Sequence, residues 1–241
     1  MGTQVQYRRV LLKLSGEALG GKRDYGVDFE VVRSVSRQLK QVIGHGVQIA
    51  LVVGGGNIFR GLAASTRGFD RATGDYMGML GTVINALALQ EGMEQIGLEV
   101  RTMTAVQMNQ VAEPYIRRVA LSHLEKNRVV LLAGGIGNPF FTTDTTAALR
   151  AVELGAEVVL KATKVDGIYT ADPLLDPSAV KLTRVDYLEM LNRGIGVMDN
   201  TALTLCMDNG IPIVVFDLLK EGNMERVILG EEIGTMVGSP K

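Results

Sequence analysis

The chain has 241 residues, of which 46% are hydrophobic and 21% are charged, a composition that excludes an intrinsically disordered protein and allows one large α/β domain or two small ones. The formal net charge is −1 and no long basic run is present, so a nucleic acid is disfavoured as the main ligand. Apolar runs are too short, and too often broken by glycine or charge, to span a membrane.

Apolar strands alternate with amphipathic helices along nearly the whole chain. The hydrophobic pattern predicts strands at residues 9–14, 47–53, 99–103, 128–133, 157–161, 213–216 and 234–238. It predicts helices at residues 28–43, 70–96, 118–126, 145–153, 185–191, 200–208 and 224–228, the first of them capped by Asp28. This alternation is typical of a mainly parallel sheet with helices on both faces, and no linker or internal repeat divides the chain, so we expect a single domain, residues 1–241, with two lobes.

The N-terminal segment and the cysteine and histidine content narrow the protein class further. Residues 1–9 lack the apolar core of a signal peptide, and a single cysteine, Cys206, leaves no intrachain disulfide; both fit a cytoplasmic protein. Cys206 lies on an apolar helix face, where we expect it to pack in the core. His45 and His123 have no serine or cysteine motif nearby, which disfavours a histidine-dependent hydrolase and a histidine metal site.

Glycines cluster where three predicted strands end, at Ser15-Gly16, at residues 54–56 and at residues 134–137. Ligands of parallel α/β sheets bind beyond the carboxyl ends of the strands, so the three clusters are predicted to line one crevice. In the third cluster, residues 134–144 join a glycine-rich loop, two threonines and Asp144 at a junction between strand and helix. Exposed amides and a helix N-terminus favour an anion there, which indicates phosphate handling.

Two phosphate-binding motifs are nearly matched and both fail. Residues 16–23 resemble a P-loop, but Arg23 stands where a hydroxyl should bind Mg²⁺, and no helix follows directly. Residues 135–140 resemble the start of a dinucleotide-binding fingerprint, but Phe140 stands where the third glycine is needed. A nicotinamide dehydrogenase remains an alternative.

Several charged residues adjoin these glycines. Lys13 lies inside an apolar strand, where a lysine is costly unless it is paired or functional, although its ammonium could also reach solvent at the strand end. The adjoining Ser15-Gly16 favours a phosphate contact. Arg60 follows residues 54–56 and offers a bidentate cation to phosphate.

Asp75 and the segment 161–173 have two interpretations each. Asp75 lies among apolar residues and glycines on a predicted helix, where it could bind ribose hydroxyls or form a salt bridge. Lys161, Lys164 and Tyr169 could serve a nucleotide, or could belong to a charged surface hairpin around the turn at Asp166-Gly167.

In this order, the segments resemble the amino-acid kinase family, and within it the bacterial UMP kinases. The resemblance runs from about Arg8 to Gly234-Thr235, and Gly-Asn-Pro-Phe-Phe-Thr-Thr-Asp at residues 137–144 is its most specific segment. The glycine patterns alone would indicate only the broader family, with its carbamate, acetylglutamate and aspartate kinases. The other diagnostic segments are residues 11–17, 54–61, 75–82 and 161–173.

The resemblance implies an α/β fold, a three-layer αβα sandwich around a mainly parallel, roughly eight-stranded sheet with an N-terminal acceptor lobe and a C-terminal ATP lobe. It implies a homohexamer of three dimers and the reaction ATP + UMP → ADP + UDP of pyrimidine nucleotide biosynthesis, with Mg²⁺ carried by ATP and no metal held by the chain. It also implies inhibition by UTP and activation by GTP. Residues 90–94, on the helix near the family's effector site, are acidic rather than basic, so the GTP response of this chain stays open.

The same resemblance assigns the site residues. Catalysis falls to Lys13, Arg60, Asp144, Lys161 and Lys164, with Asp144 orienting the lysines and the choice between Lys161 and Lys164 left open. ATP is expected at Lys13, Leu14, Ser15, Gly16, Gly56, Arg60, Thr163, Tyr169 and Asp172. UMP is expected at Gly55, Asp75, Ile136, Gly137, Asn138, Pro139, Phe140, Phe141, Thr142 and Thr143. The segment associated with GTP activation comprises Gly21, Lys22, Arg23, Asp24, Tyr25 and Gly26.

Other functions remain open at this point. A kinase of the same fold could phosphorylate a carboxylate or a carbamate instead of UMP. A non-catalytic nucleotide sensor would bind UMP or ATP without forming UDP.

Overall fold

The computed structural model of the chain describes residues 5–23, 25–59, 68, 70–163, 165–171, 173, 175–176 and 178–238. These residues form a nine-stranded sheet in which every neighbouring pair runs parallel except β10 and β11. Its strands, in spatial order, are β4 (Glu113–Pro114), β3 (Val100–Thr104), β5 (Val129–Ala133), β2 (Gln48–Val53), β1 (Arg9–Leu14), β6 (Val158–Thr163), β10 (Ile213–Asp217), β11 (Thr235–Val237) and β9 (Arg184–Val185).

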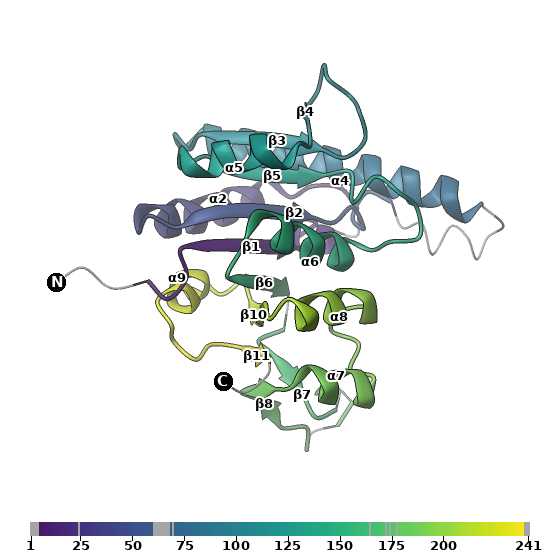
Figure 1. Cartoon of the computed structure of the whole chain (residues 1–241), viewed down its shortest axis with the longest axis vertical. Coiled ribbons are helices and arrows are strands. Elements are labelled where there is room, and N and C mark those ends of the chain that lie inside the picture. Colours follow the sequence, from purple (N-terminus) through teal and green to yellow (C-terminus); the bar gives the residue numbers. More distant parts are fainter. Residues whose placement is uncertain are drawn as a thin grey trace.

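Helices cover both faces of this sheet (Figure 1). One face carries α2 (Phe29–Gly44), α4 (Arg71–Glu94) and α9 (Asn223–Ile228), and the other carries α5 (Arg117–Glu125), α6 (Thr143–Leu154), α7 (Tyr187–Arg193) and α8 (Asn200–Asp208), each set packed in its own apolar cluster. The predicted three-layer α/β fold is confirmed. Cys206 is fully buried in the second cluster, as expected, and burial raises the pKa of its thiol to about 12.

The alternation of side chains along the central strands determines which face each residue joins. In β1, Leu12 and Leu14 pack on the face of α2 and α4, whereas Leu11 packs on the face of α6. Lys13 is two residues from Leu11 and therefore points toward α6. Lys161 is the register partner of Lys13 on the neighbouring strand β6, so the two lysines lie side by side on that face.

Capping side chains define several helix starts more closely than hydrophobic periodicity does. Asp28 caps α2, as predicted. The predicted helix at 145–153 begins at Thr143, because the Thr142 hydroxyl accepts the backbone N–H groups of the first turn. The predicted helix at 185–191 begins at Tyr187, because Asp186 caps it and Val185 is part of β9.

The shortest elements escape the hydrophobic pattern. They are α1 (Gly16–Leu19), β4, β9 and the antiparallel pair of β7 (Ile168–Tyr169) and β8 (Lys181–Leu182). The chain bends at Asp166-Gly167 as predicted, but this bend precedes β7, and the hairpin closes over residues 170–180. No helix among the described residues is long and apolar enough to cross a membrane.

Candidate active site

The glycine clusters that follow β1 and β2 are in close contact. The Gly54 N–H donates a 2.9 Å hydrogen bond to the Leu14 carbonyl at the end of β1. A Cβ atom on Gly16 would lie 2.7 Å from the Gly54 oxygen and 2.8 Å from the Gly56 nitrogen, so a larger residue cannot replace Gly16 without displacing backbone.

Helix α4 joins the third cluster to the first two. A Cβ atom on Gly55 would lie 2.5 Å from the Gly78 oxygen of α4, so the loop after β2 rests directly on this helix. The Gly134 N–H, at the end of β5, donates a 2.8 Å hydrogen bond to the buried Thr82 hydroxyl of the same helix. The three predicted clusters therefore lie at one edge of the sheet, with α4 beneath two of them.

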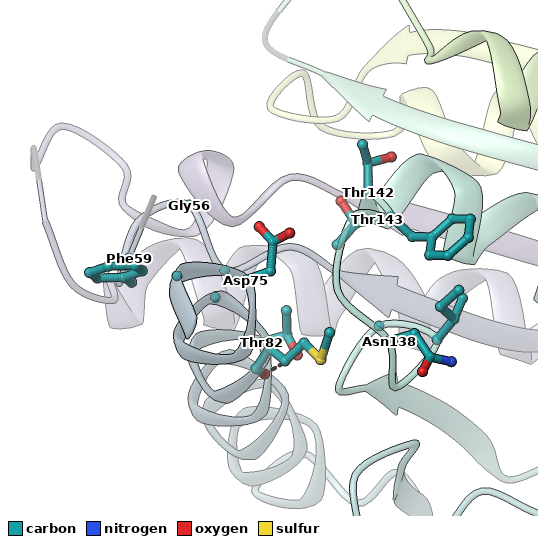
Figure 2. A pocket seen from close by; sticks show the side chains of 14 residues that line it. Gly56, Phe59, Asp75, Thr82, Asn138, Thr142 and Thr143 are labelled. Carbon is teal, nitrogen blue, oxygen red and sulfur yellow. Dashed lines mark hydrogen bonds between the residues drawn. The ribbon is translucent and has the colours of Figure 1, made fainter. Parts of the chain in front are cut away.

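A pocket of about 130 Å³ opens between α4 and the loop that leads into α6 (Figure 2). Eight residues predicted to bind nucleotide line it: Gly55, Gly56, Asp75, Ile136, Asn138, Phe141, Thr142 and Thr143. Gly137, Pro139 and Phe140 belong to the same loop but do not line the pocket. Six further residues line the pocket that were not among those expected to contact a nucleotide: Phe59, Gly74, Gly78, Met79, Thr82 and Gly135.

Asp75 connects the two walls of this pocket. Its Oδ2 accepts a 2.8 Å hydrogen bond from the Phe140 N–H, and the Arg71 Nε lies 2.9 Å from both of its oxygens. Phe140 has a φ of 72°, a left-handed conformation that costs a non-glycine residue roughly 1–2 kcal/mol. The salt bridge considered for Asp75 is thus present, and the carboxylate still borders the pocket; in Figure 2 it points toward the loop of Thr142 and Thr143.

A buried ion cluster lies where α6 begins, one residue beyond Thr143. The Lys13 ammonium is 2.7 Å from Asp144 Oδ1, and the Lys161 ammonium is 2.7 Å from Asp144 Oδ2. Lys161 also donates to the Val197 carbonyl. Both lysines are 8% exposed. Two ammonium groups share one carboxylate, so with all three ionised the cluster has an excess charge of +1 in a poorly solvated place.

Burial and charge oppose each other in this cluster. Burial raises the pKa of the Asp144 carboxyl, but the charges of Lys13 and Lys161 together outweigh burial and hold that pKa below its ordinary value. Burial lowers the pKa of the Lys161 ammonium, and the neighbouring Lys13 lowers it further, while Asp144 offsets only part of the effect. The environment therefore stabilises the carboxylate and is less favourable to the second cation.

Asp199 contributes to the site although its sequence context indicates only a helix cap. It caps α8 by accepting from the Ala202 N–H, and its carboxylate also accepts from the hydroxyls of Thr142 and Thr145. Asp199 thereby joins the starts of α6 and α8. This second role depends on two segments more than 50 residues apart in sequence and was not predictable from local pattern.

Of the described residues expected at ATP, Lys13 to Gly16 lie at the end of β1 and the start of α1, Thr163 ends β6 and Tyr169 lies in β7; among them, Gly56 alone lines the pocket. Thr163 ends β6 and donates 2.6 Å to the Val165 carbonyl. The Tyr169 hydroxyl donates 2.8 Å to Asp166, which also pairs with Lys181. Leu14 and Ser15 end β1 and precede α1. Arg60, Lys164 and Asp172 lie outside the described residues.

The segment associated with GTP activation is a surface loop between α1 and α2. Lys22, Arg23 and Tyr25 are exposed, and Tyr25 is 69% exposed. Asp24 lies outside the described residues. At the end of the segment, the Gly26 N–H donates to the Asn57 carbonyl, and the Asn57 Nδ2 donates to the Gly26 carbonyl. Asn57 follows the glycines after β2.

The electrostatics of the cluster predict an acid-dependent stability. Asp144→Asn should lower the free energy of unfolding by about 3 kcal/mol at pH 6, because two buried lysines lose their anion. Since the folded pKa of Asp144 is lowered, its contribution is fully present above the ordinary carboxyl pKa near 4 and is lost as pH falls through the folded value. Urea unfolding at several pH values should show the difference from wild type shrinking below about pH 4.

The exposed Asp208→Asn is the matched control and should change stability little at any pH. A difference between wild type and Asp144→Asn that is the same at pH 3 and pH 6 would contradict the assignment of charge to this carboxyl.

Comparison with known proteins agrees with this geometry. Residues 8–217 match the model of the amino acid kinase family. A UMP kinase from Bacillus anthracis is 38% identical, with a TM-score of 0.94 over 98% of this chain and 97% of that chain. A UMP kinase from Ureaplasma parvum is 30% identical (TM-score 0.90, 97% and 100% covered), and a uridylate kinase from Archaeoglobus fulgidus is 28% identical (TM-score 0.71, 95% and 99% covered). The resemblance found in the sequence is confirmed, and the chain belongs to the amino-acid kinase family.

Proposed function

We infer that this chain is a UMP kinase, which transfers the γ-phosphoryl group of ATP to UMP and forms ADP and UDP, a step of pyrimidine nucleotide biosynthesis. The family and the two solved UMP kinases that are at least 30% identical over nearly the whole chain support this function. The observation that carries it is the buried cluster of Lys13, Lys161 and Asp144, whose excess positive charge lies next to the pocket. Such a cluster attracts a polyanion and has little use in a purely structural role.

We assign UMP to the pocket and ATP to the ends of β1 and β6. Asp75 would bind the ribose, the loop from Ile136 to Phe141 would surround the uracil, and Thr142 with Thr143 would bind near the phosphate. Lys13, Ser15-Gly16 and Gly56 lie between the two nucleotides in this arrangement, with Thr163 and Tyr169 on the ATP side. The contact between Gly16 and the Gly54–Gly56 loop supports it, because that contact joins the end of β1 to a wall of the pocket.

The reaction needs charge stabilisation more than proton transfer. A phosphate oxygen of UMP, already ionised at pH 7, attacks the γ-phosphorus; the bond from that phosphorus to the bridging oxygen of ADP breaks, and ADP leaves with the electron pair. Lys13 and Lys161 would stabilise the charge that spreads over the transferred group. Asp144 keeps the two ammonium groups at fixed positions about the reacting phosphate. Lys161 fits this role by its contact with Asp144.

We propose that Mg²⁺ enters the site on the phosphates of ATP, where it would neutralise part of their charge. Among the described residues, no three acidic, histidine or cysteine side chains converge to hold a metal ion. The cationic cluster instead suits a nucleotide that brings its own metal.

We also propose the regulation and location implied by the sequence. UTP shares its uracil and ribose with UMP and would inhibit by occupying the same pocket, and the enzyme would act in the cytoplasm. Activation by GTP would require a response of the exposed loop at residues 21–26, which is joined to the pocket loop through Asn57. The acidic Glu91 and Glu94 near the end of α4 disfavour a strong GTP response.

We further propose that the chain assembles as a homohexamer of three dimers, with α4 in the dimer contact. One face of α4 presents an apolar stripe to solvent: Tyr76, Met77, Leu80, Ile84 and Leu87. Leu80 and Ile84 are 52% and 49% exposed. Contiguous apolar surface of this kind marks an association site, and pairing with the same helix of a second copy would remove it from water.

Coupled measurement of ADP and UDP formation tests the function directly. With UMP and Mg-ATP the chain should form UDP, and CMP, glutamate derivatives and carbamate should be poor acceptors. Lys13→Ala should lower kcat by on the order of a hundredfold, the usual effect of removing one donor that stabilises transition-state charge. UMP or ATP binding without UDP would identify a sensor; nicotinamide binding would identify a dehydrogenase; full activity of Lys13→Ala would remove Lys13 from the reaction.

Asp75→Asn separates the acceptor from the donor. The amide cannot accept from ribose, Arg71 and the Phe140 N–H as the carboxylate does, so the KM for UMP should rise at least tenfold while the KM for ATP changes less than threefold. Initial rates with each substrate varied in turn give both constants. Equal changes in the two would place Asp75 outside the acceptor site.

Light scattering after gel filtration tests the assembly. Leu80→Glu places a charge in the apolar stripe and should dissociate the dimer contact, because an unpaired charge in an apolar interface is strongly unfavourable. Leu188→Glu on α7 is the matched control, since Leu188 is 58% exposed and lies outside the stripe. An unchanged mass for Leu80→Glu would exclude α4 from the contact.

A further inference from the structure

Two buried asparagines, Asn57 and Asn85, form a paired hydrogen-bond network behind the pocket. The Asn85 Nδ2 donates 2.6 Å to Asn57 Oδ1, and the Asn57 Nδ2 donates 3.0 Å to Asn85 Oδ1. Each amide has one further bond: Asn85 Nδ2 donates 2.7 Å to the Gly54 carbonyl, and Asn57 Nδ2 donates 2.7 Å to the Gly26 carbonyl. Both amide groups therefore use both donors, and Asn85 is completely buried in the middle of α4.

The bond to Gly54 fixes the direction of one peptide group. In a trans peptide the C=O and the following N–H point in opposite directions, and the described residues contain no cis peptide. Because the Gly54 oxygen is turned toward Asn85, the Gly55 N–H is turned away from Asn85. That N–H donates no hydrogen bond to any described residue, and Gly55 lines the pocket.

The orientation of the peptide between Gly54 and Gly55 has to be fixed by its surroundings. Gly54, Gly55 and Gly56 have no Cβ atoms, so side chains of their own do not restrict the peptide between Gly54 and Gly55 to one orientation. An apolar pair at the positions of Asn57 and Asn85 would fill the same space, and replacing both partners of a buried hydrogen bond in this way is often close to neutral for stability. The amides therefore supply something that packing alone does not, namely the orientation of the Gly54–Gly55 peptide.

We propose that Asn85, itself oriented by Asn57, is a positioning residue that holds the Gly55 N–H toward the phosphate of the acceptor nucleotide. The donor is then preorganised, so that it positions the attacking phosphate for transfer without rearrangement. This inference rests on the proposed function, since it concerns the same pocket. It adds a residue that does not line the pocket and acts through the backbone of one that does.

Asn85→Leu tests the proposal by kinetics. The variant keeps the branched shape of the side chain and loses the bond to Gly54. Because the Gly55 N–H is then no longer held toward the acceptor phosphate, kcat should fall by on the order of a hundredfold and the KM for UMP should rise, while the KM for ATP stays within threefold of wild type. Leu89→Ala, at a fully buried site one turn further along α4, is the stability-matched control and should keep kcat within threefold. A wild-type kcat for Asn85→Leu would overturn the proposal, as would an equal loss in Leu89→Ala.

Asn57→Ala is the second variant, in case Asn85→Leu does not fold. It leaves Asn85 in place but removes the partner that orients it, and should lower kcat at least tenfold; an unchanged kcat would overturn the proposal.

A readout independent of turnover is the amide resonance of Gly55 in glycine-labelled protein titrated with UMP, and separately with inorganic phosphate. In the wild type this resonance should shift on ligand addition, and in Asn85→Leu the shift should be lost. No shift in the wild type would overturn the proposal. Absence of UDP formation by the wild type would instead overturn the proposed function, so the two failures are distinguishable.

Discussion

The site depends on one buried carboxylate between two buried ammonium groups. Lys13 and Lys161 are register partners on adjacent parallel strands, so the sheet itself brings two like charges together. Without Asp144 their repulsion and their desolvation would oppose the pairing of β1 with β6 on this face. Asp144 is in the first turn of α6, where a helix N-terminus favours an anion and where Thr142 caps the helix. The ion cluster thus ties the centre of the sheet to the start of one helix.

The same cluster explains why the chemistry requires no histidine. One lysine paired with one carboxylate would have no net charge. Here Lys13 and Lys161 share the carboxylate of Asp144, so the second lysine leaves a net charge of +1. Burial and the neighbouring Lys13 lower the pKa of Lys161, because a second buried cation is unfavourable there. In the proposed reaction, the phosphates of ATP and UMP would bring negative charge to this cluster. Binding energy would then act on the group that is transferred.

The sequence predicts the fold and the principal charges because these depend on local pattern. Alternation along residues 9–14 identifies Lys13 as an exception inside an apolar strand, and glycines after three strands identify the edge of the sheet where the pocket lies. The long-range hydrogen bonds of Asp199 and Asn85 could not be predicted in this way. Their partners are Thr142, Thr145 and the Gly54 carbonyl, which are distant in sequence, and a lone polar residue on a helix has no pattern that names its tertiary partner.

A glycine-rich pocket has a physical difficulty that α4 resolves. Glycines let backbone amides approach a phosphate closely, but they also leave those amides free to turn, which weakens preorganisation. Three side chains of α4 hold the surrounding loops by their backbones: Asp75 accepts from Phe140, Thr82 accepts from Gly134, and Asn85 donates to Gly54.

Asp75, Thr82 and Asn85 lie on one side of α4. Thr82 is seven residues and Asn85 ten residues after Asp75, so their side chains are rotated about the helix axis by roughly 20° and 80° from that of Asp75. The exposed stripe that includes Leu80 and Ile84 lies on the other side of the same helix. A partner that packs on the stripe would therefore contact α4, the helix whose side chains hold the pocket loops in place. With the proposed dimer contact on this face, subunit contact and loop geometry would be linked through a single helix, without any separate connecting segment.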